Sequence, residues 1–341
     1  TAVRKQVDEL RQKVDLVVVL THQGPTAPMQ TNDEAVPEVY RGNAENLALA
    51  AAVPGIDVIF AGHTDAGTPE ALRDPVNGTL IMQTWGQGQH LGVLQLDLVA
   101  DPDNAGFLNP GGSAASAKSK LVPVNSDALA PAPAVKALLE RYRSDHPELF
   151  VAAGALDAPA TRSYYTESTL GNLLADFVAD HAQADIGLIP GGALRKDLPA
   201  GSIRRVDVQD MFPFKDRVAV VELSGQDLMA VIEQGLSLER GLLQVSGLEV
   251  SYDPRAEPGG RLLALSAGGQ PVEREARYRV ATLEILAKGG DSYRQFLAAD
   301  TVDLKDTAFI DALLSYLASM SRVGRAVAVP SLGRYSVKTS P

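Results

Sequence analysis

The chain has 341 residues, a net charge of −11 and no cysteine. This length is sufficient for two domains with hydrophobic cores, and the acidic charge without a basic stripe argues against a nucleic-acid polymer as a partner. The lack of cysteine excludes disulfides, thiolate metal sites and cysteine nucleophiles, and no apolar run reaches the about 18 residues that a membrane span needs.

The first hundred residues alternate predicted helices and strands, which indicates a layered α/β domain. Each of the first two helices leads directly into an apolar strand. The predicted elements in chain order are a helix over 2–13, a strand over 15–20, a helix over 43–52, and strands over 57–61, 79–83 and 91–99.

Two of these strands end at a histidine. His22 follows the strand over 15–20, and His63 follows the strand over 57–61, with Asp65 two residues further on. Ligands of open α/β sheets bind at the carboxyl ends of the strands, and imidazole beside carboxylate suits Zn²⁺, Mn²⁺ or a similar ion. We therefore expect these three residues to lie close together at one sheet edge as metal ligands. A single histidine at a strand end is more often structural, so the two matching strand ends are the stronger observation.

The segment from residue 101 to about 133 is rich in glycine, proline and other loop residues, and it predicts a domain boundary. A connecting helix is predicted over 135–142, and from about residue 151 helices and strands alternate again. The predicted elements are helices over 167–182, 206–211 and 228–236, and strands over 186–189, 217–223, 245–252, 262–265 and 278–285.

Seven short motifs, in a fixed order, resemble the 5′-nucleotidase family, which includes UDP-sugar hydrolases and 2′,3′-cyclic-nucleotide phosphodiesterases. Each motif is weak alone, but their order and spacing hold over nearly the whole chain. They are Val19-Leu20-Thr21-His22-Gln23-Gly24, Gly62-His63-Thr64-Asp65, Glu167-Ser168-Thr169-Leu170-Gly171-Asn172-Leu173, Pro190-Gly191-Gly192-Ala193-Leu194-Arg195, Phe212-Pro213-Phe214, Leu243-Gln244-Val245-Ser246-Gly247 and Gly289-Gly290-Asp291.

The resemblance implies an α/β (α+β) fold, in which a partial calcineurin-like metallophosphoesterase layered sheet is followed by a 5′-nucleotidase C-terminal substrate-binding domain. The implied domains are the C-terminal half of the metallophosphoesterase domain over 1–105, a linker and connecting helix over 106–150, and the substrate-binding domain over 151–341.

The resemblance also implies a metal-dependent hydrolase of nucleotides or related phosphomonoesters, in which two divalent ions (Zn, Mn, Mg or similar) activate a water. His22 and His63 would be ligands of one ion, and Asp65 falls where the family usually has a second histidine. The family's Asp-x-His, Gly-Asp and Gly-Asn-His-Glu motifs, which include its catalytic histidine, do not occur in this sequence. We therefore expect the catalytic residues upstream of Thr1, on an N-terminal remainder of the same protein. The family further implies a periplasmic, extracellular or cell-envelope location.

Four residues match substrate-binding positions of the family. Arg195 would reach the phosphate or ribose with its guanidinium group, Phe214 would stack on one face of the base, Asp291 would contact the ribose, and Gly241 would line the same pocket. Ile285 occupies the position of the second aromatic wall and cannot stack on a base. Arg195 could instead be a surface residue, and Phe214 could instead be a core residue between strands.

Two other functions stay open at this point. A nucleotidase fold that binds or serves as a scaffold without turnover is favoured by the missing motifs, by Ile285 and by Pro190. It is disfavoured by the possible metal ligands and by the matched arginine, which are His22, His63, Asp65 and Arg195. A sulfur-oxidation relative, which hydrolyses a sulfur-bound group with the same two metals, is disfavoured by Phe214 and Asp291. The sequence upstream of Thr1 would distinguish the enzyme from the binding protein.

Overall fold

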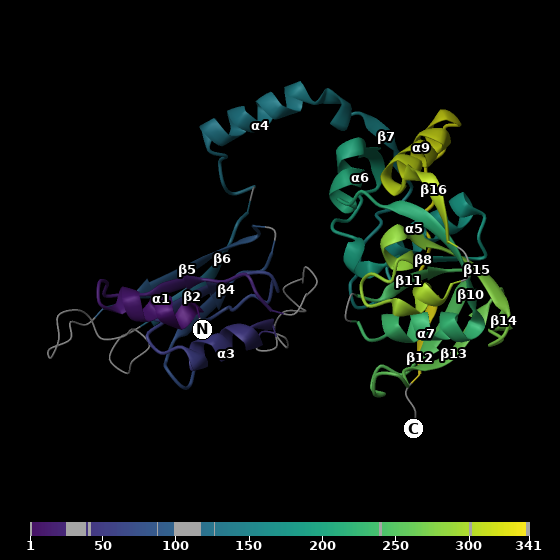
Figure 1. Cartoon of the computed structure of the whole chain (residues 1–341). Helices are drawn as coiled ribbons and strands as arrows, with labels where there is room; N and C mark the ends of the chain where they lie inside the picture. The colour runs from purple at the N-terminus through teal and green to yellow at the C-terminus, as the bar shows by residue number, and fades with distance from the viewer. Residues whose placement is uncertain are drawn as a thin grey trace. The chain divides into compact units, whose positions relative to one another are not determined.

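The computed structural model describes residues 2–24, 39, 42–86, 88–98, 117–125, 127–238, 241–299 and 302–338. The chain forms two compact units, unit 1 (Thr1–Ala132) and unit 2 (Pro133–Pro341), whose elements are labelled in Figure 1. None of the helices in the described ranges combines the length and the apolar character that crossing a membrane requires.

Unit 1 is built on a sheet with the described strand order β1-β2-β4-β3, in which β1, β2 and β4 are parallel and β3 is antiparallel to β4. Its elements are α1 (Ala2–Arg11), β1 (Val18–Leu20), α3 (Ala44–Ala52), β2 (Val58–Ala61), β3 (Leu72–Arg73) and β4 (Leu80–Gln83). The helices pack on one face of this sheet, because Val7 of α1 and Ala50 of α3 share a core with the paired Ile59 and Ile81.

The opposite face of this sheet is only partly covered. A hairpin of β5 (His90–Leu96) and β6 (Ala117–Pro123) contacts it, with Gly92 of β5 against the end of the Met82 side chain. On β1, by contrast, Val18 is 44% and Leu20 80% exposed within the described structure. The segment from residue 101 to about 133, whose loop residues predict a domain boundary, also contains the strand β6, which pairs along its whole length with β5.

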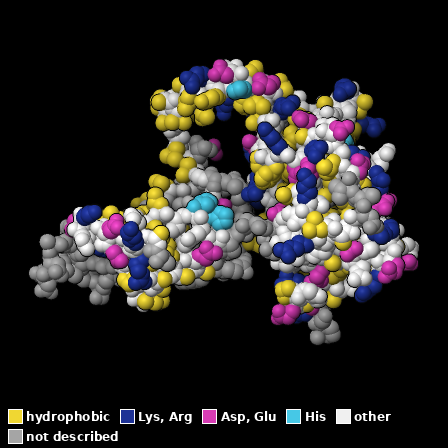
Figure 2. Space-filling model, in the orientation of Figure 1, with side chains coloured by type: hydrophobic (Ala, Val, Ile, Leu, Met, Phe, Trp, Pro, Cys, Tyr) yellow, Lys and Arg dark blue, Asp and Glu magenta, His cyan; other side chains and the backbone are white. Residues whose placement is uncertain are grey.

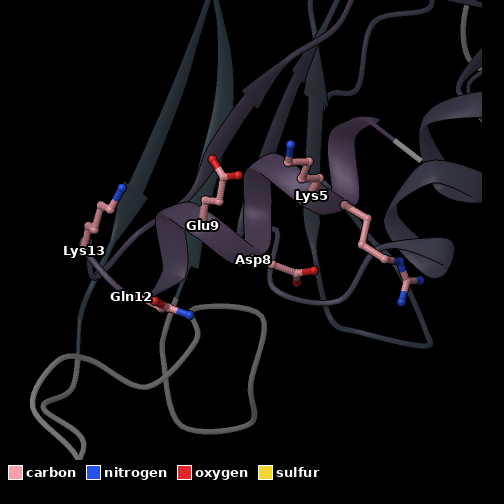
Figure 3. A pocket seen from close by; sticks show the side chains of 6 residues that line it. Lys5, Asp8, Glu9, Gln12 and Lys13 are labelled. Atoms are coloured by element: carbon pink, nitrogen blue, oxygen red, sulfur yellow. The ribbon is translucent and has the colours of Figure 1, made fainter.

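A buried carboxylate joins α1 to the sheet. Asp57, which precedes β2, is fully buried, accepts a hydrogen bond from the Val17 backbone N at 2.6 Å and forms an ion pair with Arg11. The outer side of α1 carries side chains of both charges, among them Lys5 and Glu9, which line a shallow hollow (Figure 3). Such mixed charge is typical of the solvated face of an amphipathic helix.

Unit 2 contains a central sheet with the described order β11-β8-β15-β10-β16, a second sheet of order β14-β13-β12-β17, and the pair β7-β9. The helices are α4 (Pro133–Asp145), α5 (Thr169–Ala182), α6 (Arg205–Met211), α7 (Gly225–Gly235), α8 (Glu284–Ala287) and α9 (Phe309–Arg322). The strands are β7 (Ala152–Leu156), β8 (Ile186–Pro190), β9 (Gly201–Arg204), β10 (Arg217–Ser224), β11 (Leu243–Ser246), β12 (Leu248–Tyr252), β13 (Leu262–Ala267), β14 (Gln270–Pro271), β15 (Arg277–Leu283), β16 (Val302–Ala308) and β17 (Tyr335–Val337).

The central sheet of unit 2 is buried on both faces, and β10 shows why its strands read as continuous apolar runs. Val218 and Val220 lie in the core that α5 and α9 cover, whereas Ala219 and Val221 lie in the core that α7 and the second sheet cover. Because successive strand residues point to opposite faces, a strand between two layers needs apolar residues at every position.

One glycine separates the two sheets of unit 2. The sequence predicts a single strand over 245–252, but Gly247 has φ +74° and its position leaves no room for a Cβ, which would lie 2.2 Å from the Asp185 carbonyl oxygen. The chain turns there, so β11 pairs with β8 in the central sheet while β12 joins the second sheet. The prediction of one continuous strand is therefore wrong.

The last strand of unit 2 is held by one carboxylate. Glu167 accepts hydrogen bonds from Asn172 Nδ2 at 2.7 Å and from the backbone N of Gly333 at 2.9 Å. It also accepts from the backbone N of Arg334 at 3.0 Å and of Tyr335 at 3.3 Å. This carboxylate thus connects the start of α5 to the segment that enters β17.

Helix α4 has no buried residue. Its large apolar side chains, which are Val135, Leu138, Leu139 and Tyr142, are each between 45% and 55% exposed. Their spacing of three, four and seven residues places them on one side of the helix, where apolar side chains are visible on the surface (Figure 2).

Candidate functional site

The structure brings His22 and His63 together at the carboxyl ends of β1 and β2. The β1–β2 pairing continues into the two turns, since the Thr21 backbone N donates to Phe60 O and the Gly62 N donates to Thr21 O. The Nδ1 atom of His63 lies 3.2 Å from Nε2 of His22, and neither residue is buried. Histidine side chains are visible on the surface of unit 1 in Figure 2. Two imidazole nitrogens at this spacing can contribute to one metal site.

Gln83, at the end of β4, forms hydrogen bonds that hold the turn that carries His63. Gln83 is 2% exposed, and its Nε2 donates to Thr64 Oγ1 at 2.8 Å and to Ala66 O at 3.2 Å. The same nitrogen lies 3.2 Å from Asn43 Oδ1, just before α3. These contacts fix a backbone in which His63 has φ +86°, an angle that costs energy for a residue with a Cβ.

Asp65 follows in the same turn with φ +53°, and its carboxylate lies against the backbone of Gly86, where a Cβ would come within 2.3 Å of Oδ2. Across the described ranges, no three His, Cys, Asp or Glu side chains are close enough to hold a metal ion. The two histidines therefore form a pair rather than a complete site, and the metal-ligand role of His22, His63 and Asp65 stays a prediction.

In unit 2, Arg195 and Phe214 lie side by side. The Arg195 Cζ atom is 5.3 Å from the centre of the Phe214 ring, which is within the range of a cation–π contact. The inner edge of Phe214 packs on Phe212, which is buried in the core, while Phe214 itself is 41% exposed. Phe214 is thus not a core residue, and part of its ring is accessible to a ligand.

Gly241 lies next to the turn that precedes Arg195. It has φ +83°, and a Cβ at this position would come within 2.8 Å of the Gly192 backbone N. Any other residue here would displace the glycine turn, so the close approach of two backbones explains why glycine occupies the position.

Ile285 and Asp291 lie together on another turn. Asp216, two residues after Phe214, connects this turn to Phe214 and Arg195. The Asp216 Oδ2 atom lies 3.5 Å from the Ile285 backbone N, and Gly290 N donates to Ile285 O at 2.8 Å, which brings Asp291 to the same turn. Ile285 is 46% exposed, and Asp291 has φ +52°. The structure therefore places all four matched residues on turns at the ends of the central sheet, while their contact with a substrate stays a prediction.

Two carboxylates near these turns have shifted pKa values. Burial raises the pKa of the Asp216 carboxyl, and the negative charge of Glu284 adds to this effect. Hydrogen bonds from Arg217, at 2.9 and 3.0 Å, and from Lys288 lower the pKa of Glu284 to about 2. Glu284 is therefore ionised throughout the neutral range and its charge is matched by two cations.

Residues 149–298 match the family model described as the 5′-nucleotidase, C-terminal domain. This match, together with the similar proteins below, supports a member of the 5′-nucleotidase family. All four matched substrate-binding positions, from Arg195 to Asp291, lie inside the matched range. The α/β fold expected from the sequence is confirmed, with a metallophosphoesterase-type unit followed by the C-terminal nucleotidase domain.

Similar proteins cover most of this chain. The trifunctional nucleotide phosphoesterase protein YfkN of Bacillus subtilis is 28% identical over 316 residues, which are 86% of this chain and 20% of that protein. Cell wall protein Lmo0130 of Listeria monocytogenes is 25% identical over 97% of this chain and 44% of its own length. The crystal structure of a 5′-nucleotidase precursor from Thermus thermophilus superposes with a TM-score of 0.78 at 25% identity, covering 99% of this chain and 67% of that one. The chain thus spans about a fifth of the Bacillus relative and less than half of the Listeria relative.

Two buried glutamines support the 5′-nucleotidase motifs, and sequence patterns assign a role to neither, although Gln244 lies within one of these motifs. Gln83 holds the His63 turn, and Gln244 accepts a hydrogen bond from the Ser168 backbone N at 2.8 Å, which ties the start of α5 to β11. Both are polar residues inside otherwise apolar strands, which is the one signal in the sequence that marks them.

Proposed function

We propose that this chain forms part of a metal-dependent 5′-nucleotidase-type phosphoesterase that hydrolyses nucleotides or related phosphomonoesters, with the catalytic residues upstream of Thr1. The match of residues 149–298 to the 5′-nucleotidase C-terminal domain carries the proposal. The name of the Bacillus relative, a nucleotide phosphoesterase, supports the same substrate class.

In this proposal unit 2 binds the nucleotide. The accessible part of the Phe214 ring stacks on the base, and the Arg195 guanidinium beside it attracts the phosphate or ribose end of the ligand. Asp291 accepts a hydrogen bond from a sugar hydroxyl, and Gly241 allows the ligand to approach the backbone. Ile285 offers only apolar contact to the base, so selectivity among bases is expected to be low.

Unit 1 would hold metal through His22 and His63. Their donor set fits a borderline divalent ion such as Zn²⁺ or Mn²⁺, because the two imidazole nitrogens already face each other without rearrangement of the backbone. Asp65, on the same turn, would be the third ligand. When bound, two such ions would supply an activated water and charge stabilisation for the phosphate.

A location outside the cytoplasm is part of the proposal. It is supported by the relative named as a cell wall protein and by the structural neighbour named as a precursor.

Binding of AMP to the purified chain tests the nucleotide site separately from catalysis. Because stacking contributes about 1–3 kcal/mol per base, Phe214→Ala is expected to weaken AMP binding by roughly tenfold. Ile285→Phe is expected to tighten it, since a second ring would then face the base. Leu263→Ala is the control, because Leu263 is 46% exposed on β13 and truncation there removes comparable apolar surface. If AMP binding responds to neither site variant, the base is not bound at Phe214.

Hydrolysis is tested in the protein that also contains the residues upstream of Thr1. With Mn²⁺ it is expected to release phosphate from AMP, and His63→Asn is expected to lower both bound metal and turnover. Retained AMP binding without any turnover in the intact protein would instead identify a nucleotide-binding protein that does not catalyse.

A further inference from the structure

Unit 2 contains a hollow that involves none of the four matched substrate residues. It has a volume of about 610 Å³ and lies between α5, α9 and the chain near Ala328 and Pro330. Volumes of about 300–1,000 Å³ are typical of small-molecule sites. The proposed nucleotide site does not account for this hollow.

Aromatic rings form one side of the hollow. Phe177 of α5 is 5% exposed and anchors the group, with His181 stacked on it at 5.5 Å between ring centres and 22° between planes. Tyr316 of α9 packs against Phe177 at 5.5 Å and is itself partly exposed. The side of Tyr316 that is not packed on Phe177 is therefore available to a ligand.

Two carboxylates on α5 line the same hollow. Asp176 pairs with Arg334 at 2.7 Å and accepts a hydrogen bond from Ser246, so its charge is largely matched. Asp180, one turn further along α5, is exposed, and no residue in the described ranges donates a hydrogen bond to its carboxylate or pairs with it. Asp180 is thus the carboxylate that can accept a ligand.

Negative charge acts on the Tyr316 side of the hollow. Burial raises the pKa of the Tyr316 hydroxyl, and the charges of Asp180 and Asp176 raise it further. The described lining includes no lysine or arginine. Burial and the charge of Lys305 lower the pKa of His181, which leaves the imidazole neutral at pH 7, while Lys305 itself pairs with Asp303 at 3.1 Å.

From this combination we propose that the hollow between α5 and α9 binds a small organic cation with primary ammonium groups. An ammonium group can lie over the exposed part of the Tyr316 ring and donate hydrogen bonds to the Asp180 carboxylate. The hydroxyls of Ser315 and Thr307, which also line the hollow, can accept hydrogen bonds from a second ammonium group. An anion would meet the Asp180 carboxylate, and the described lining offers it no lysine or arginine, so the hollow favours a cation.

Isothermal titration calorimetry of the full chain with 1,4-diaminobutane tests the proposal. At 150 mM NaCl, where unspecific attraction between exposed charges is screened beyond about 8 Å, saturable binding of one diamine per chain is expected. Asp180→Asn and Tyr316→Leu should each weaken it by roughly tenfold, the effect of losing one charge-assisted or cation–π contact. Asp180→Asn is an exposed, isosteric change, so it tests the site without disturbing the fold.

Two controls separate the site from general charge effects. Glu222→Gln removes one exposed carboxylate on β10, outside the hollow, and is expected to leave the affinity unchanged. The neutral analogue 1,4-butanediol is expected not to bind. Absence of saturable diamine binding, an equal loss in Glu222→Gln, or equal binding of the diol would overturn the proposal. Because AMP binding at Phe214 is measured independently, failure here leaves the proposed nucleotide site untouched.

Discussion

Replacement of Glu167 by alanine tests how unit 2 holds its last strand. The Glu167 carboxylate accepts four hydrogen bonds, three of them from consecutive backbone nitrogens at the entry to β17. Hydrogen bonds to a charged acceptor contribute about 1.5–3 kcal/mol each when buried, and they are not additive. Because Glu167 is only partly buried, water replaces part of this loss, and we expect Glu167→Ala to lower the free energy of unfolding by about 2 kcal/mol.

The same carboxylate gives a pH dependence with a defined sign. Burial opposes ionisation of Glu167, but the hydrogen bonds from Asn172, Arg334 and Gly333 together outweigh it and lower its pKa below the ordinary value of 4.5. A group whose pKa is lower in the folded state stabilises the fold above its unfolded pKa. This contribution is therefore complete at neutral pH and is lost as the pH falls below about 4.5. Glu167→Gln should remove this component of acid destabilisation.

Urea unfolding at pH 7 and at pH 4, with hydrogen exchange of the β17 amides, measures both effects. In Glu167→Ala the amides of β17 should exchange faster than in the parent chain, while those of β10 in the central sheet should not change. Glu249→Ala, an exposed change on the neighbouring β12, is the matched control and should shift stability by less than about 0.5 kcal/mol. An equal loss in both variants, or unchanged β17 exchange in Glu167→Ala, would refute the assigned role.

Two further predictions concern the cores. Leu174→Ala, at a fully buried position of α5, should cost about 2–5 kcal/mol in urea unfolding of unit 2, whereas Leu297→Ala, at a residue that is 65% exposed, should cost less than about 0.5 kcal/mol. Arg11→Ala should destabilise unit 1 by about 3 kcal/mol, because it leaves the buried Asp57 carboxylate without its cation. Lys5→Ala, on the outer side of α1, is the control and should not change the stability. Equal effects of the two substitutions would contradict the buried ion pair.

Sequence patterns located the histidine turns well because both depend on local signals. An apolar run that ends at a glycine identifies a buried parallel strand, and two such runs place His22 and His63 at one sheet edge. The start of α5 was also predictable, since Ser168 precedes the helical run and its side chain caps Gly171 N at 3.0 Å.

The sequence could not predict features that depend on distant contacts or on single backbone angles. The alternating residues of β6 lie among glycine and serine, so only the pairing with β5 shows that they form a strand. The break at Gly247 requires knowledge of the Asp185 carbonyl that the turn approaches. The direction of the Asp65 side chain likewise follows from its positive φ, which no apolar pattern encodes.

Helix α4 has a consequence for handling the protein. A helix of 13 residues that buries none of them is only marginally stable in water, so its helical state depends largely on its own hydrogen bonds. Arg141 and Arg143 lie in this exposed helix, and the core residues of unit 1 and of unit 2 form separate clusters on either side of it in the sequence. Limited digestion with trypsin should therefore cut at α4 first and release two fragments that each retain an intact core. The histidine pair of unit 1 and the proposed nucleotide-binding turns of unit 2 could then be studied in separate proteins.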